Sequence, residues 1–140
     1  SLPTMHLVTL HFVSPTAFSA GNRQFELFPK PFQVWKNLQL TWNSYAPEPM
    51  MMKKDGLQEF LTEKVTVMQC NLSTTTLHFP EYTQKGFLGT CTYSIQEDNF
   101  FASRLTTLAA FARYAGIGYK TRMGMGQVRA DFGIPSMPSS

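Results

Sequence analysis

The sequence lacks the features of a membrane protein and of a disulfide-framed one. No stretch approaches the ~20 consecutive apolar residues that span a bilayer, and no basic-then-apolar signal peptide opens the chain. Two cysteines, Cys70 and Cys91, are too few for a disulfide framework, so we expect free thiols and a cytoplasmic location. These cysteines and the three histidines show no metal-ligand spacing. We therefore expect no metal, no other cofactor and no membrane partner.

Acidic residues are absent between Asn99 and Ala130, although this segment carries five basic residues. The rest of the chain has seven basic and nine acidic residues. A basic segment on a near-neutral body is what a polyanion-binding face requires, but a solvated run of charge gives the same pattern. The basic residues of the segment are Arg104, Arg113, Lys120, Arg122 and Arg129.

The length and composition predict one domain. With 140 residues, 43% of them hydrophobic, the chain is ample for a single core and too short for two full domains. We expect one domain over residues 1–133 and a disordered tail over residues 134–140. Because the chain begins at Ser1 without an initiator Met, we expect it to be part of a longer protein.

The first half of the chain reads as a strand followed by a helix. Alternation over Met5–Val13 places Val8, Leu10 and Phe12 on one face and His11 on the other, and Ser14-Pro15 should end this strand. A helix should begin at Pro31, which suits the first helical turn. Its apolar stripe, expected in the core, is Trp35, Leu38, Trp42 and Tyr45. A short helix is also expected over residues 55–61.

The middle of the chain predicts a hairpin. A strand over Lys64–Leu72, extended toward Phe79, should turn around Pro80-Glu81 and return over Phe87–Ile95. A symmetric turn there pairs residues whose numbers sum to 161. Such a register sets Cys70 opposite Cys91 and Met68 opposite Tyr93.

The last part predicts a helix over Asn99–Ala115, ended by Gly116, and a strand over Gln127–Gly133. Alternation turns Val128, Ala130 and Phe132 inward. The whole order is β-α-β-β-α-β. It predicts an α+β, ferredoxin-like fold in which an antiparallel four-stranded sheet carries two helices on one face.

A glycine-rich loop joins this helix to this strand and is the most informative segment. It holds four glycines and two cations, a combination that brings backbone N–H groups and positive charge close to phosphate. Neither the nucleotide-binding P-loop nor the dinucleotide fingerprint fits, since both join a strand to a helix. The residues are Gly116, Gly118, Lys120, Arg122, Gly124 and Gly126.

The loop sequence GIGYKTRMGMGQV resembles the glycine-rich loop of the RAMP-superfamily CRISPR proteins. The segments HFVSPTAF, LFPKPFQVW and GFLGTCTYSI, and the helix end LAAFARYAGIGYKT, are similar to the C-terminal domain of the branch that processes CRISPR repeat RNA. The blocks occur in the right order and cover Leu7 to Phe132. The chain is thus identified as resembling the C-terminal ferredoxin-like domain of a pre-crRNA-processing endoribonuclease.

The resemblance implies an enzyme that cleaves repeat RNA without a metal ion. A ribose 2′-hydroxyl attacks the adjacent phosphate and leaves a cyclic phosphate, and the usual catalytic residues belong to an N-terminal domain, so no catalytic residue is assigned here. The implied partners are CRISPR repeat RNA and that N-terminal ferredoxin-like domain, with other CRISPR complex subunits or a homodimer as further candidates. His11 would contact RNA or pack between the domains.

The predicted RNA-binding surface combines the loop glycines with three cations. Arg129 should project from the open face of the sheet, unless Asp131 pairs with it and neutralises its charge. Phe18, Phe25 and Phe28 are candidates for RNA stacking or domain docking. The residues of the predicted surface are Gly116, Gly118, Lys120, Arg122, Gly124, Gly126 and Arg129.

Two other functions remain open at this point. A non-catalytic RAMP subunit of a CRISPR effector complex would use the same fold to bind guide RNA. A ferredoxin-like enzyme or ligand-sensing domain unrelated to RNA is disfavoured by the basic loop.

Overall fold

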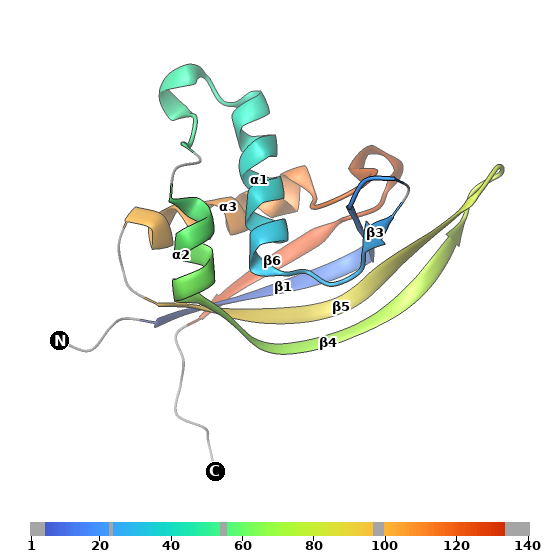
Figure 1. Ribbon diagram of the computed structural model, residues 1–140, viewed down its shortest axis with the longest axis horizontal. Coiled ribbons are helices and arrows are strands. Elements are labelled where there is room, and N and C mark those ends of the chain that lie inside the picture. Colours follow the sequence, from blue (N-terminus) through green and yellow to red (C-terminus); the bar gives the residue numbers. More distant parts are fainter. Residues whose placement is uncertain (1–4, 23, 54–55, 97–99, 134–140) are drawn as a thin grey trace, which may run out of the picture.

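The computed structural model describes residues 5–22, 24–53, 56–96 and 100–133. An antiparallel four-stranded sheet, in the order β4-β5-β1-β6, carries the helices on one face (Figure 1). The order of elements along the chain confirms the predicted ferredoxin-like α+β fold. The sheet consists of β1 (Met5–Thr16), β4 (Val65–His78), β5 (Thr83–Gln96) and β6 (Val128–Gly133), and the helices are α1 (Pro31–Tyr45), α2 (Leu57–Lys64) and α3 (Phe100–Ala115).

Smaller elements lie between these. The segment after β1 forms a hairpin of two short strands. Helix α2 corresponds to the short helix expected over residues 55–61 and runs on to Lys64. Helix α2 begins after Gly56, whose φ of +80° lies in the left-handed region. It buries Leu57, Phe60 and Leu61 against the core. The remaining elements are β2 (Phe18–Ser19), β3 (Phe25–Glu26) and the 3₁₀ turns η1 (Glu48–Met50) and η2 (Thr121–Met123).

The core lies between the sheet and the helices. Trp35 on α1 is fully buried, donates its indole N–H to the Leu105 carbonyl at 2.9 Å, and meets the Tyr93 ring edge-on at 4.9 Å. The Tyr93 hydroxyl donates to the Pro29 carbonyl at 2.5 Å, and burial raises the pKa of this phenol far above its usual range. The inward face of the sheet is made by Val8, Leu10, Phe12, Phe87, Cys91, Tyr93 and Ile95, as the alternation predicts.

Strand β1 runs further than predicted. It continues through Pro15 to Thr16, so the expectation that Ser14-Pro15 ends it is wrong. The pairing with β5 shifts between Phe12 and Thr16, and this irregularity accommodates a residue that cannot donate to the ladder. The Pro15 carbonyl is thereby free to accept a hydrogen bond from Gly126 at 2.9 Å.

The β4–β5 hairpin turns where predicted. Cys70 lies opposite Cys91, with the Cα atoms 4.2 Å apart. The two residues form a disulfide, so the expectation of free thiols is wrong. Directly opposed residues of antiparallel strands are close enough for this bond.

The predicted pairing of Met68 with Tyr93 is also wrong. A bulge shifts the register between Val67 and Gln69, so that Val67 lies opposite Tyr93. Met68 is the extra residue and is 55% exposed. A bulge inserts one residue into one strand only, and alternation in a single strand does not reveal it.

Two residues expected in the core lie outside it. Tyr45 is the last residue of α1 and is 73% exposed, and Phe132 near the end of β6 is 51% exposed. Val128 and Ala130 do turn inward as predicted.

The tail at residues 134–140 and the predicted helix start at Asn99 fall outside the described residues. Among the helices described, none has the length and apolar character needed to cross a membrane.

Candidate nucleic-acid interface

The glycine-rich loop lies at the end of the sheet, between α3 and β6. In Figure 1 it stands beside the β2–β3 hairpin, on the side toward which the long β4–β5 hairpin extends. Gly116 ends α3 with a φ of +74°, as predicted, and its N–H donates to the Ala112 carbonyl at 2.8 Å.

Hydrogen bonds close the base of the loop and tie it to the end of β1 and to Ala17, the residue that follows. Ile117 N–H donates to the Gly126 carbonyl at 2.8 Å and so closes the loop across its own base. Tyr119 N–H donates to the Ala17 carbonyl at 2.8 Å, and Gln127 N–H donates to the Ser14 hydroxyl at 2.8 Å. These bonds hold the base of the loop in place against the end of β1.

Three of the four glycines are required by this packing. A Cβ on Gly126 would overlap the Ile117 carbonyl oxygen, and one on Gly118 would overlap the Ala17 carbonyl oxygen. A Cβ on Gly116 would lie 3.0 Å from the Gly126 carbonyl oxygen. All three also have positive φ.

Gly124 is different. It has a φ of +90°, and a Cβ there would meet nothing within 4 Å. Only its backbone conformation calls for glycine, and the space around it is open.

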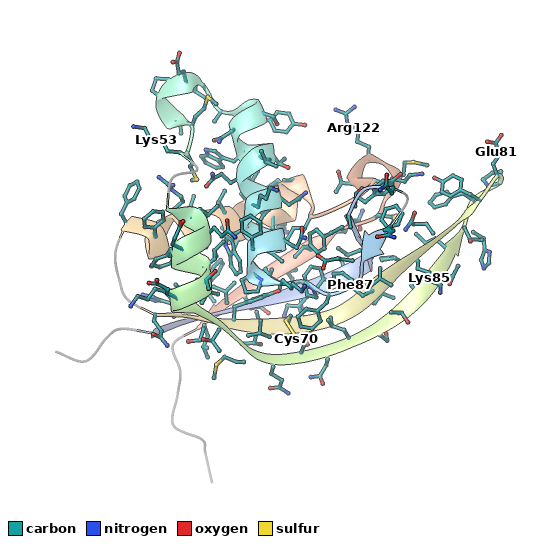
Figure 2. All side chains as sticks on the ribbon, viewed as in Figure 1. Lys53, Cys70, Glu81, Lys85, Phe87 and Arg122 are labelled. Atoms are coloured by element: carbon teal, nitrogen blue, oxygen red, sulfur yellow. A yellow bond between two sulfur atoms is a disulfide. The ribbon has the colours of Figure 1, made fainter. Side chains whose placement is uncertain are left out.

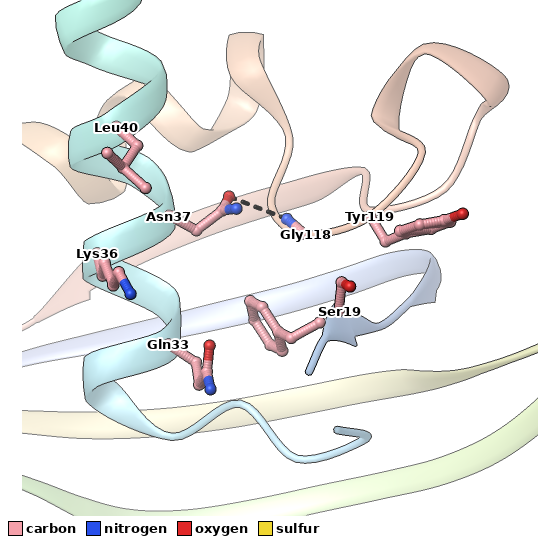
Figure 3. A pocket seen from close by; sticks show the side chains of 8 residues that line it. Ser19, Gln33, Lys36, Asn37, Leu40, Gly118 and Tyr119 are labelled. Carbon is pink, nitrogen blue, oxygen red and sulfur yellow. Dashed lines mark hydrogen bonds between the residues drawn. The ribbon is translucent and has the colours of Figure 1, made fainter. Parts of the chain in front are cut away.

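The expectation that the glycine N–H groups stand open to phosphate is wrong. Gly116, Gly124 and Gly126 donate to backbone carbonyls, and Gly118 donates to the Asn37 side-chain oxygen at 3.0 Å (Figure 3). The glycines thus shape the loop, and its cations are left to attract an anion.

Lys120 lies at the loop tip in a left-handed conformation, with a φ of +57°. Its ammonium lies 3.9 Å from the ring centroid of Tyr82, and 5.2 Å and 5.4 Å from those of Phe79 and Tyr119. Phe79 and Tyr82 stack on each other at the β4–β5 turn, with centroids 4.9 Å apart. Lys120 therefore joins the hairpin tip to the loop through cation–π contacts.

Arg122 has no such contact. It is exposed in η2, and it makes no ion pair, hydrogen bond or ring contact with the rest of the described chain (Figure 2). Its guanidinium is open to solvent on the far side of the loop from the sheet. Arg104, by contrast, lies over the Phe100 and Phe101 rings and donates to the Lys53 carbonyl at 2.7 Å, and burial lowers its pKa. It has a structural role and belongs to no cationic surface.

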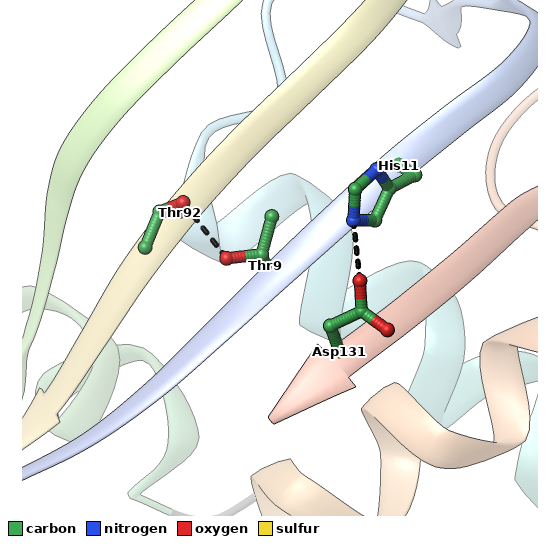
Figure 4. Close-up of polar contacts among 4 residues, drawn as sticks. All are labelled: Thr9, His11, Thr92 and Asp131. Atoms are coloured by element: carbon green, nitrogen blue, oxygen red, sulfur yellow. Dashed lines mark hydrogen bonds and ion pairs between the residues drawn. The ribbon is translucent and has the colours of Figure 1, made fainter. Parts of the chain in front are cut away.

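Arg129 projects from β6 onto the open sheet face, directly across from His11. Asp131 does not pair with it. The Asp131 carboxylate binds the His11 Nε2 at 2.7 Å instead, beside a Thr9–Thr92 hydroxyl contact of 2.9 Å (Figure 4). The alternative, in which Asp131 pairs with Arg129 and neutralises its charge, is therefore wrong.

The predicted surface divides into two parts. Lys120 and Arg122 lie at the loop tip, whereas Arg129 lines a groove with Gly116 and Arg113.

A second hollow, of about 320 Å³, lies on the helix side between α1 and the loop (Figure 3). Lys36 and Asn37 of α1 and Tyr119 of the loop line it.

The aromatic residues that meet Lys120 were not singled out from the sequence. The hairpin register places Phe79 and Tyr82 at the turn, but no sequence signal places that turn against the loop. Of the predicted stacking candidates, Phe18 is buried in the core, Phe25 packs edge-on against Tyr119 at 4.9 Å, and Phe28 is exposed. Across the part of the chain that the structure describes, no three potential metal ligands come together.

Comparisons with known proteins cover most of the chain. The sequence model of the family described as CRISPR-associated endoribonuclease Cas6 matches residues 10–128. The CRISPR-associated endoribonuclease Cas6 of Streptococcus thermophilus is 23% identical over 120 residues, which cover 86% of this chain and 49% of that protein.

Solved structures agree with this match. A Cas6 of Thermus thermophilus has a TM-score of 0.79 and 26% identity, covering 92% of this chain and 55% of that one. A Cas6 product complex has a TM-score of 0.77 and 29% identity, covering 89% of this chain and 51% of that one. The chain thus spans about half the length of the relatives it matches.

Proposed function

Because the chain belongs to the family of CRISPR-associated Cas6 endoribonucleases, we propose that it binds CRISPR repeat RNA as part of an enzyme that processes precursor CRISPR RNA. The observation that carries the proposal is the loop tip. There Arg122 is exposed without a partner, and the Lys120 ammonium lies over aromatic rings at the same tip. Cations in this arrangement bind phosphates without reading the bases.

The division of labour within the loop supports this role. The glycines hold the loop base against β1, and the rigid base presents the cations in one place. A positioned cation loses less conformational entropy on binding than one on a flexible tail. The loop is thereby suited to hold an RNA backbone in a fixed register relative to the sheet.

The proposed reaction needs no metal ion from this chain. Attack by a ribose 2′-hydroxyl takes its nucleophile from the RNA itself, so the protein has to align the strand, move protons and stabilise the phosphorane. We assign this chain the alignment, together with a second ferredoxin-like domain that would supply the acid–base groups. The coverage of the relatives supports that reading, since this chain spans only 51% and 55% of two solved Cas6 chains.

Filter binding with the 140-residue chain tests the proposal. Repeat RNA should bind with an affinity that falls steeply with salt, and a scrambled RNA of equal length should bind more weakly. Equal affinity for both RNAs would favour a subunit that coats guide RNA, and absence of any salt-dependent binding would refute RNA binding.

Cleavage by this chain is not expected. The purified chain should leave repeat RNA intact, with or without a chelator. Metal-independent cleavage that His11→Ala abolishes would contradict the assignment and make His11 the general base.

A further inference from the structure

A groove of about 510 Å³ lies where the last turn of α3 meets the start of β6. It is lined by residues from the helix, the loop and the strand, among them Arg113, Tyr114, Thr121, Gln127 and Arg129. It opens on a different side of the loop from the hollow beside α1, which shares none of these residues. The predicted RNA-binding surface includes two of its residues, Gly116 and Arg129, but neither Arg113 nor Tyr114.

The charge in the groove is positive and unopposed. Arg113 and Arg129 are both exposed, and neither has an acidic partner among the described residues. Among the described residues that line the groove none is acidic, and the nearest carboxylate in sequence, that of Asp131, is held by His11 at 2.7 Å. Two arginines thus line one groove, and the fork of N–H donors on a guanidinium matches the oxygens of a phosphate.

An aromatic ring stands at the rim of the groove. Tyr114 is 82% exposed, although it follows Arg113 directly in α3 and belongs to a helix whose other face is in the core. Among the described residues Tyr114 makes no ring contact and no side-chain hydrogen bond, so its ring is available to stack on a base. In a duplex the bases are stacked on each other, so only a single-stranded segment offers a free base face.

We propose that this groove binds a phosphodiester of a single-stranded RNA segment, with Arg113 and Arg129 on the phosphate and Tyr114 stacked on an adjacent base. The inference rests on the proposed RNA-binding function and extends it beyond the loop tip. The strand would pass from the tip, at Arg122, around the loop to the edge strand β6. The ligand class is single-stranded RNA flanking a repeat hairpin, not the hairpin duplex.

Matched variants isolate the two contacts. Arg113→Gln removes one exposed cation from the groove, and Lys53→Gln removes one from the opposite end of the molecule (Figure 2). Tyr114→Ala removes the exposed ring, and Tyr45→Ala removes a ring of similar exposure, 73%, on α1. Thermal melts should show all four variants folded, because exposed side chains contribute little to stability.

The measurement is filter binding of repeat RNA with and without its single-stranded flank, across a range of salt. Arg113→Gln should lower the log–log salt slope by ~0.7 and Tyr114→Ala should weaken binding at least about fivefold, only when the flank is present. The two control variants should bind as the unaltered chain does. A 4-thiouridine in the flank should crosslink to the peptide that carries Tyr114.

Two results would overturn the inference, and they differ. If the unaltered chain binds repeat RNA while both groove variants match their controls and the crosslink maps elsewhere, the groove assignment fails and the proposed function stands. If the unaltered chain shows no salt-dependent RNA binding, the proposed function and the groove assignment fail together.

Discussion

The base and the tip of the glycine-rich loop use the same residue type for different purposes. At the base, Gly118 and Gly126 pack against carbonyl oxygens with no room for a Cβ. At the tip, Gly124 has open space around it, and its neighbours Lys120 and Arg122 carry the charge. The glycines of a glycine-rich segment beside cations therefore do not all have the same role. Here the glycines at the base hold the loop in place, and the cations at the tip are exposed to solvent.

The largest expected effect comes from a Cβ at the base of the loop. Gly126→Ala places a methyl group onto the Ile117 carbonyl at a φ of +71° and should cost about 3 kcal/mol or more, because steric overlap adds to the left-handed strain. Gly124→Ala meets only the strain, about 1–2 kcal/mol. Chemical denaturation of both variants measures the difference. Equal losses of unfolding free energy in the two variants would show that glycine is no more strictly required at the base of the loop than at its tip.

A smaller effect is expected at the tip cation. Lys120→Met keeps the apolar stem and the backbone conformation but removes the ammonium from the three rings, which should cost about 0.5–1 kcal/mol. Arg122→Gln should change the free energy of unfolding by less than about 0.5 kcal/mol, since its side chain contacts nothing described. Urea unfolding of the pair tests this. If both variants match the unaltered chain, Lys120 does not hold the hairpin tip.

The smallest effect is expected on the open sheet face. Asp131→Asn removes the partner of His11, and because the pair is partly exposed the stability should change by no more than about 1 kcal/mol. RNA affinity at low salt should rise about two- to threefold, because a negative charge near Arg129 is lost. A fall in affinity would indicate that the His11–Asp131 pair positions RNA.

The fold was largely predictable because its signals are local. Alternation in β1 and β5, Pro31 at the start of α1 and Gly116 at the end of α3 each depend on a few neighbouring residues. The turn at Pro80-Glu81 fixes the hairpin register near it, so the facing of Cys70 and Cys91 followed. The Met68 bulge lies further along the same strand and depends on the partner strand, which alternation does not describe. The disulfide was missed for another reason. Free thiols were inferred from the low number of cysteines, which indicates a reducing compartment, and that inference did not take the predicted facing of Cys70 and Cys91 into account.

The candidate site was predictable only as a stretch of sequence. Glycines and cations marked the loop. The resemblance named the family of the chain, which the family match confirms, while the role of the loop stays a prediction. The sequence could not say which glycines pack against carbonyls, because Ala17 and Asn37 lie about 80 or more residues away along the chain from Gly118. It could not place Phe79 and Tyr82 beside Lys120, or bring Arg113 to the groove that Arg129 lines. These contacts depend on tertiary packing.

The most direct test of the account is the salt dependence of repeat-RNA binding by the Lys120→Ala, Arg122→Ala double variant. If both cations contact phosphate, the log–log slope should fall by ~1.4 relative to the unaltered chain, and affinity should fall by a similar factor for every RNA sequence. A Lys30→Ala, Lys53→Ala variant, which loses the same charge outside the loop, should keep the original slope. An unchanged slope and affinity in the loop variant would contradict the account and place the RNA elsewhere on the molecule.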